Sequence, residues 1–120
     1  MLSACHFLPA LSNKAAHRIR ATIRSWRLGA NRNNQSLEEI AKFVNPYVRG
    51  WVNYYGRFYK SALTPVLRCL ERSLVYWVRR KFKRFRRHQR QAVHWLGRVA
   101  QREPDLFEMW RIGIRPAAGQ

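Results

Sequence analysis

The side chains of this sequence best suited to do chemistry are its arginines and lysines, and that chemistry is the binding of phosphate. The 120 residues carry 24 Lys and Arg against 6 Asp and Glu, which gives a formal net charge of +18. A charge of this sign and size predicts a polyanionic partner, with nucleic acid first and a membrane surface second. Most of the cations are arginine, whose planar guanidinium binds phosphate bidentately and also stacks on bases.

The densest group of cations is the run at residues 79–90, which has almost no acidic neighbours. Like charges four residues apart on a helix repel one another, so the run is costly unless an external anion offsets it. Charged runs are often only solvated faces, but this imbalance favours a binding face. Adding cations from neighbouring segments, and two tyrosines that could contact a base or sugar, the predicted nucleic-acid contacts are Arg20, Arg24, Arg27, Arg49, Arg57, Lys60, Arg79, Arg80, Lys83, Arg84, Arg86, Arg87, Arg90, Tyr47 and Tyr54.

No group of residues predicts an active site, a cofactor or a metal site. Polymerases and nucleases hold two divalent ions between several carboxylates, whereas Asp105 is the only aspartate here and the five glutamates are scattered. The four histidines have no carboxylate or cysteine at ligand spacing. Cys5 and Cys69 belong to no metal or redox motif, so the cytoplasm is the expected compartment. We therefore expect no enzymatic activity.

An all-helical fold must position these side chains, because apolar residues recur at three- and four-residue steps along the chain. A first helix is expected at 13–27, after the capping residue Ser12. Ser36 and Glu39 form an S-x-x-E capping box, which predicts a short helix through Phe43. Asn45 followed by Pro46 predicts the start of a new helix.

The second half of the chain predicts the longest helix. Thr64 and Pro65 are expected to begin it, and it should run to about Arg87 or Arg90, with an apolar stripe from Leu67 to Phe85. Another helix is expected at 91–102, before Pro104. The predicted fold is an all-α bundle of about four to five helices with a capping C-terminal turn, in which Trp51, Tyr55 and Phe58 lie in the core and Leu106, Phe107 and Trp110 cover the base.

A single domain fits this length. Residues 1–11 are expected to be a connector, 12–112 the helical domain and 113–120 a flexible tail. No run approaches the roughly 20 apolar residues that span a bilayer, so no membrane-spanning segment is predicted.

Residues 45–55, Asn-Pro-Tyr-Val-Arg-Gly-Trp-Val-Asn-Tyr-Tyr, resemble the signature of the group II intron maturase-specific domain, the thumb or X domain of intron-encoded reverse transcriptases. Further pieces similar to that family follow in the same order at 7–12, 36–39, 58–63, 81–83 and 104–110. The resemblance implies an RNA-binding helical domain that binds group II intron RNA, promotes its splicing-active fold and grips a template–primer duplex.

In that family, catalysis belongs to the RNA and to a palm domain with a Tyr-x-Asp-Asp strand, which these 120 residues do not contain. A separate chain carrying the palm and fingers is therefore a conceivable partner. Three alternatives stay open: a generic basic structural nucleic-acid-binding protein, a non-functional maturase remnant, and a membrane-active basic helix at 65–90. A maturase domain should prefer structured intron RNA over duplex DNA of equal length, whereas a generic polycation should bind both alike.

Overall fold

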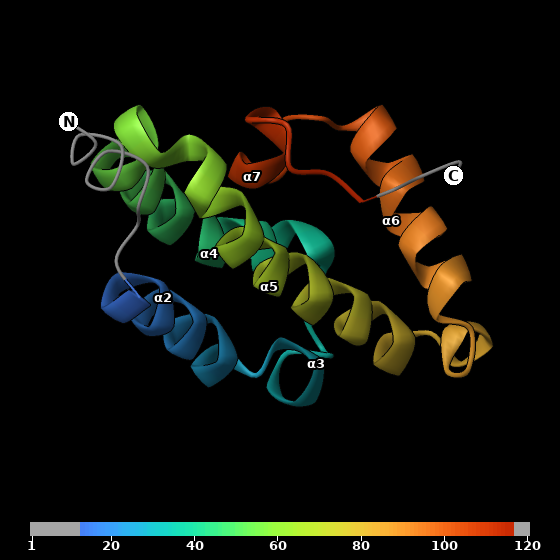
Figure 1. Cartoon of the computed structure of the whole chain (residues 1–120). Coiled ribbons are helices and arrows are strands. Elements are labelled where there is room, and N and C mark those ends of the chain that lie inside the picture. The colour runs from blue at the N-terminus through green and yellow to red at the C-terminus, as the bar shows by residue number, and fades with distance from the viewer. Residues whose placement is uncertain (1–12, 117–120) are drawn as a thin grey trace, which may run out of the picture.

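The computed structural model describes the backbone of residues 13–116 and the side chains of that range except those of 56–61. This part of the chain is helical and contains no strand (Figure 1), which confirms the predicted all-α fold. Its elements are α2 (Asn13–Trp26), α3 (Leu28–Asn31), α4 (Leu37–Trp51), the π-helical segment η1 (Val52–Gly56), α5 (Arg57–Lys81), the 3-10 helix η2 (Lys83–Phe85), α6 (Gln89–Arg102) and α7 (Glu108–Arg111).

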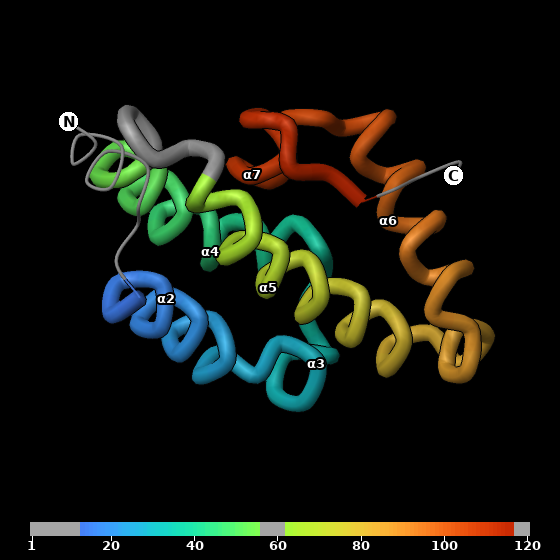
Figure 2. Tube along the Cα trace, viewed as in Figure 1, coloured from blue at the N-terminus to red at the C-terminus, as the bar shows by residue number. Residues whose placement is uncertain are grey.

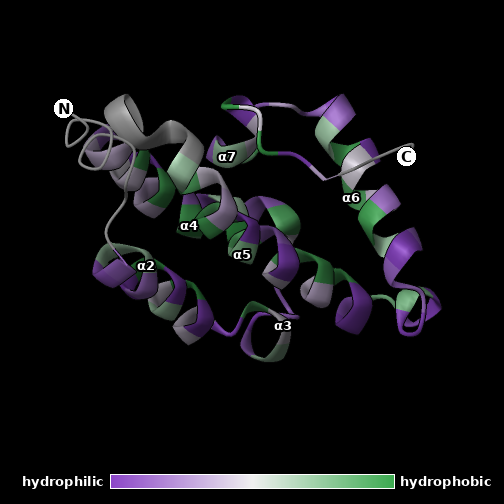
Figure 3. Cartoon of the chain, viewed as in Figure 1, coloured by the Kyte–Doolittle hydropathy of each residue, from purple (hydrophilic) through white to green (hydrophobic). Residues whose placement is uncertain are grey.

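Helix α5 lies at the centre of the bundle. It contacts α2, α3 and α6, while α7 packs against α4 (Figure 1). Figure 3 shows apolar and hydrophilic residues on different faces of α5. The apolar face carries Leu67, Leu70, Leu74, Trp77 and Val78, which are all at most 1% exposed. The stripe predicted from the sequence is therefore the core of the domain.

Helix α4 begins as predicted at the capping box. The Ser36 hydroxyl accepts a hydrogen bond from the Glu39 N–H (3.1 Å), and the Ser36 N–H donates to the Glu39 carboxylate (2.8 Å). These hydrogen bonds, that from the Ser36 backbone above all, lower the pKa of the Glu39 carboxyl. Two otherwise unpaired donors at the start of the helix are thereby satisfied.

The helix start predicted at Asn45 and Pro46 is wrong, because α4 continues through Pro46 to Trp51. Val44 and Val48 are 0% and 1% exposed, so an uninterrupted helix buries one on each side of the proline. Pro46 is exposed, and its nitrogen cannot donate the helical hydrogen bond to the Lys42 carbonyl. Burial of these two valines therefore outweighs the helix-start pattern of Asn45 and Pro46.

The same error occurs at Pro65, which lies inside α5 rather than at its start. Pro65 is exposed, while Leu63 and Val66 on either side are buried. The π-helical segment Val52–Gly56 joins α4 to α5 (Figure 2). Trp51 and Tyr55 pack, partly buried, against the core, and the predicted core role of Phe58 lies outside the described side chains.

The predicted C-terminal end of the longest helix, at about Arg87 or Arg90, is wrong. Helix α5 ends at Lys81, because Phe82 adopts extended backbone (φ −109°, ψ 114°) and a 3-10 turn follows. This turn brings Phe85 back onto the core, 5% exposed, with its ring centroid 6.4 Å from that of Trp95. Leaving the helix also removes the repulsion between like charges four residues apart that a longer helix would carry.

The C-terminal residues close the base of the bundle as predicted, with Phe107 and Trp110 at 0% exposure and Leu106 partly buried. The first residues of the predicted flexible tail pack against the domain: Ile114 is 4% exposed, and its N–H donates to the Met109 carbonyl (2.9 Å). The predicted connector and residues 117–120 lie outside the described range. Within that range, no helix is long and apolar enough to cross a membrane.

Candidate nucleic-acid interface

The turn between α5 and α6 gathers cations at one end of the bundle. We call residues 83–88 the basic turn; its Lys83, Arg84, Arg86, Arg87 and His88 line a hollow of about 400 Å³. All five side chains are exposed. Those of Lys83, Arg86 and Arg87 make no hydrogen bond or ion pair with the described residues, and Arg84 lies 4.7 Å from the Phe85 ring centroid. Four strong cations are thus free to meet an external anion.

Arg79 holds this turn in place. Its Nε and Nη2 donate to the Arg86 carbonyl (3.3 and 2.8 Å), and its Nη1 donates to the Gln89 side chain (3.4 Å). Arg79 was predicted as a phosphate contact, and its guanidinium already has these acceptors. The side chain therefore positions the basic turn as well as adding charge beside it.

A second group of cations surrounds Tyr76 on α5, and we call it the Tyr76 surface. Arg79, Arg80 and Arg86 line a hollow of about 370 Å³ beside this ring, and Arg24 and Arg27 border a hollow of about 420 Å³ that the same ring also lines. Tyr76 is 48% exposed. The fold thus brings predicted residues from the end of α2 next to others from α5 and the basic turn.

Sequence reasoning missed Tyr76. The residue sits in the apolar run of α5, between the buried Val75 and Trp77, and so was not distinguished from core positions. A signal was available, because Arg72 and Arg80 lie four residues away on either side and share its helix face. The Arg80 Nη1 donates to the Tyr76 hydroxyl (3.3 Å).

Two backbone features shape the Tyr76 surface. A Cβ on Gly29 would lie 2.2 Å from Cδ2 of Tyr76, so the ring rests directly on the backbone of α3. Arg27, between α2 and α3, has left-handed backbone (φ 47°, ψ 53°), which is unfavourable for a residue with a side chain. It is the only non-glycine residue with positive φ in the described range.

Most carboxylates of the described range lie away from these cations; the exception is Glu71, which lines a further hollow of about 270 Å³ with Tyr76 and Arg79. None lines the hollow of the basic turn or the two main hollows at Tyr76. Glu71 is paired with Arg68, and Glu108 with Arg49 and Arg111. The others are Glu38 and Glu39 at the start of α4 and Glu103 and Asp105 after α6. The described residues contain no cluster of three His, Cys, Asp or Glu that could hold a metal ion.

A family model of the group II intron maturase-specific domain matches residues 16–95 of the 120. The chain belongs to this family. No curated protein and no solved structure matches it. The maturase-specific domain is a non-catalytic part of the reverse transcriptase/maturase and is associated with group II intron RNA and its splicing. The match covers Tyr76, the basic turn and the segment 45–55, and it confirms the resemblance read from the sequence.

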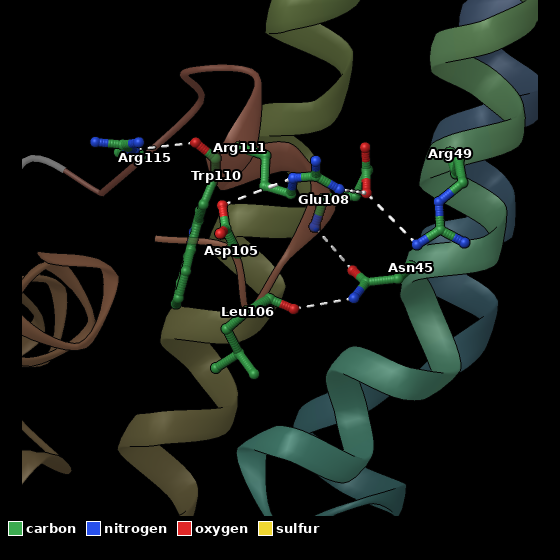
Figure 4. Close-up of polar contacts among 8 residues, drawn as sticks. All are labelled: Asn45, Arg49, Asp105, Leu106, Glu108, Trp110, Arg111 and Arg115. Carbon is green, nitrogen blue, oxygen red and sulfur yellow. Dashed lines mark hydrogen bonds and ion pairs between the residues drawn. The ribbon is translucent and has the colours of Figure 1, made fainter. Parts of the chain in front are cut away.

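The Asn45 side chain forms hydrogen bonds with the backbone of the C-terminal segment, which lies beyond the matched residues (Figure 4). Its Nδ2 donates to the Leu106 carbonyl and its Oδ1 accepts from the Glu108 N–H, each at 2.9 Å. We predicted that Asn45 caps a helix of its own, and it instead satisfies the start of α7. Arg49, one turn later, is 3.5 Å from the Glu108 carboxylate, so this predicted phosphate contact is partly neutralised.

Among the described side chains, the remaining predicted contacts do not line the hollows described above. Arg20 is partly buried on α2, and Arg90 is exposed at the start of α6. Tyr47 (45% exposed) packs against Trp26 with centroids 5.0 Å apart, whereas Tyr54 is 77% exposed. The side chains of two further predicted contacts lie outside the described range: Arg57 and Lys60.

Proposed function

We propose that this maturase-specific domain binds group II intron RNA and assists its splicing, with the basic turn and the Tyr76 surface contacting RNA phosphates. The palm and fingers needed for reverse transcription would come from outside these 120 residues, on a separate chain or in a longer protein. The observation that carries the proposal is the separation of charge. Exposed arginines and lysines from three segments border hollows that no carboxylate lines.

Separated charge of this kind suits phosphate binding for a physical reason. A cation that already faces a carboxylate gains little from a phosphate, because its charge is neutralised in the free protein. Lys83, Arg86 and Arg87 have no such partner among the described residues, so their full interaction is available to RNA. Each phosphate they contact releases condensed counterions, which makes binding depend steeply on salt.

The test uses the full chain and a structured intron RNA. We compare the triple variant Lys83→Gln, Arg86→Gln, Arg87→Gln with a control that removes the same charge elsewhere. These substitutions spare the Arg79 guanidinium and the backbone carbonyl it binds, so the turn keeps its anchor. The control replaces exposed cations on α4 and α6, away from the hollows of the interface: Lys42→Gln, Arg98→Gln and Arg102→Gln.

Filter binding over a series of salt concentrations reports the number of phosphate contacts. The basic-turn variant should lower the magnitude of the slope of log K against log salt by roughly 2–3, about one for each lost contact. The control should keep the slope of the unmodified chain. Equal slopes in all three proteins would contradict the assignment of the basic turn. Equal affinity for intron RNA and duplex DNA of the same length would instead favour a generic basic nucleic-acid-binding protein.

A further inference from the structure

We propose that the Tyr76 surface takes one unpaired nucleotide of the bound RNA, with its base against the Tyr76 ring and its phosphates on the neighbouring arginines. The inference rests on the proposed RNA binding and goes beyond it, because phosphate contact alone does not distinguish paired from unpaired nucleotides. It assigns a recognition role to a residue outside the set predicted from the sequence.

The larger hollow at Tyr76 has the lining that a base requires. Ile23 and Leu28, each 1% exposed, form an apolar floor, the tyrosine ring forms one wall, and the Ser73 hydroxyl and two arginines supply polar groups. An unpaired base has two apolar faces and a polar edge, and proteins bind such bases by stacking them on aromatic rings and hydrogen-bonding the edges. The volume of about 420 Å³ is near the lower end of roughly 300–1,000 Å³ for small-molecule sites, which suits one nucleotide.

The smaller hollow, on the same ring, has the lining that a phosphate requires. Apart from Tyr76, it is lined by Arg79, Arg80 and Arg86. Hydrogen bonds to the Arg86 carbonyl and to Gln89 fix the Arg79 guanidinium before any ligand binds, so less entropy is lost when a phosphate arrives. A nucleotide with its base in the larger hollow would carry its phosphates into this one.

The ring and its surroundings are preorganised. Contact with the Gly29 backbone fixes one side of the Tyr76 ring, yet 48% of the residue stays exposed. Arg27 borders the larger hollow in a left-handed conformation, at a position where glycine is usual after a helix. Strained backbone of this kind concentrates at ligand sites, and here it lies next to the proposed base.

The experiment compares two RNA hairpins of equal length and charge, one fully paired and one with a single bulged uridine. The unmodified chain should bind the bulged hairpin roughly fivefold to a hundredfold more tightly, as expected for stacking of one base on an aromatic ring. Tyr76→Ala should lose this preference and keep its affinity for the paired hairpin. Tyr76→Phe should keep the preference, because it retains the ring. Gln101→Ala, which truncates an exposed side chain on α6 that lines none of these hollows, is the control and should keep it too.

A second readout does not depend on any variant folding. With 5-iodouridine at the bulge, irradiation of the complex should crosslink Tyr76, and peptide mass spectrometry locates the crosslink. Equal binding of the two hairpins by the unmodified chain, or a crosslink at another residue, would overturn the inference while leaving RNA binding intact. Failure to bind either hairpin would instead count against the proposed function itself.

Discussion

Replacing Arg27 by glycine should make the domain more stable and bind RNA less well. The left-handed backbone at this residue (φ 47°) costs an L-residue roughly 1–2 kcal/mol and costs glycine almost nothing. The hydrogen bonds of the segment use backbone atoms only: the Arg27 N–H donates to Arg24 (3.1 Å), and its carbonyl accepts from Ala30 (3.1 Å) and Asn31 (2.8 Å). Glycine keeps all three.

The gain in folding stability from Arg27→Gly is reduced because glycine also makes the unfolded chain more flexible, at a cost of about 0.4–1 kcal/mol. The net stabilisation is then about 0.5–1 kcal/mol, which corresponds to a rise in Tm of about 2–6 °C for a domain of this size. Thermal unfolding followed by circular dichroism measures the change. Filter binding to intron RNA should show weaker affinity at every salt concentration, because one cation beside the Tyr76 hollow is lost.

Arg27→Ala is the control that separates the two effects. Alanine removes the same guanidinium but keeps a Cβ in the left-handed conformation, so RNA binding should fall as it does for glycine while Tm does not rise. A lower Tm for Arg27→Gly would show that the side chain stabilises the fold and that the strain reasoning is wrong. Unchanged RNA affinity in both variants would remove Arg27 from the interface.

Three further predictions concern the parts of the fold that support the interface. Asn45→Ala should lower the free energy of unfolding in urea by about 1–3 kcal/mol, since it leaves two backbone groups of the C-terminal segment without partners; Asn45→Asp, which keeps the acceptor, should lose less. Gly29→Ala should destabilise the domain by about 1–3 kcal/mol by displacing the Tyr76 ring, and adding Tyr76→Ala should recover part of that loss in a double-mutant cycle. Because its hydrogen bonds to Ser36 lower the pKa of Glu39, the capping box stabilises the fold above the ordinary value of 4.5, and this contribution should be lost as the pH falls through the lowered pKa. Ser36→Ala should abolish that step in urea midpoints measured from neutral pH to below about 4, and an unchanged step would mean that other carboxylates cause it.

Local signals were reliable where they agreed with burial. The capping box at Ser36 and Glu39 begins a helix because hydrogen bonds between near neighbours suffice to satisfy its first donors. The apolar stripe from Leu67 to Val78 is buried because its spacing matches the helix period. Proline signals failed where they opposed burial, since the roughly 3 kcal/mol that a proline costs inside a helix is offset by burying both Val44 and Val48.

The cations of the candidate interface were predicted from charge, but their grouping was not. Arg24 and Arg80 are 56 positions apart in the sequence, and only the packing of α2 and α3 on α5 brings them to the same tyrosine. Arg79 shows the same limit, because its role in holding the basic turn depends on a carbonyl that an unbroken helix would have placed elsewhere. Periodicity along a helix carries no information about which other helix lies opposite.

The sequence by itself determined the helical class, the face of α5 that is buried and the large excess of positive charge, because each depends on residue types and their spacing along one segment. Tertiary packing alone decided where the longest helix ends, what Asn45 binds and that Tyr76 rests on Gly29. Those outcomes depend on which distant surfaces meet, where burying a ring such as Phe85 is worth more than continuing a helix whose charges repel.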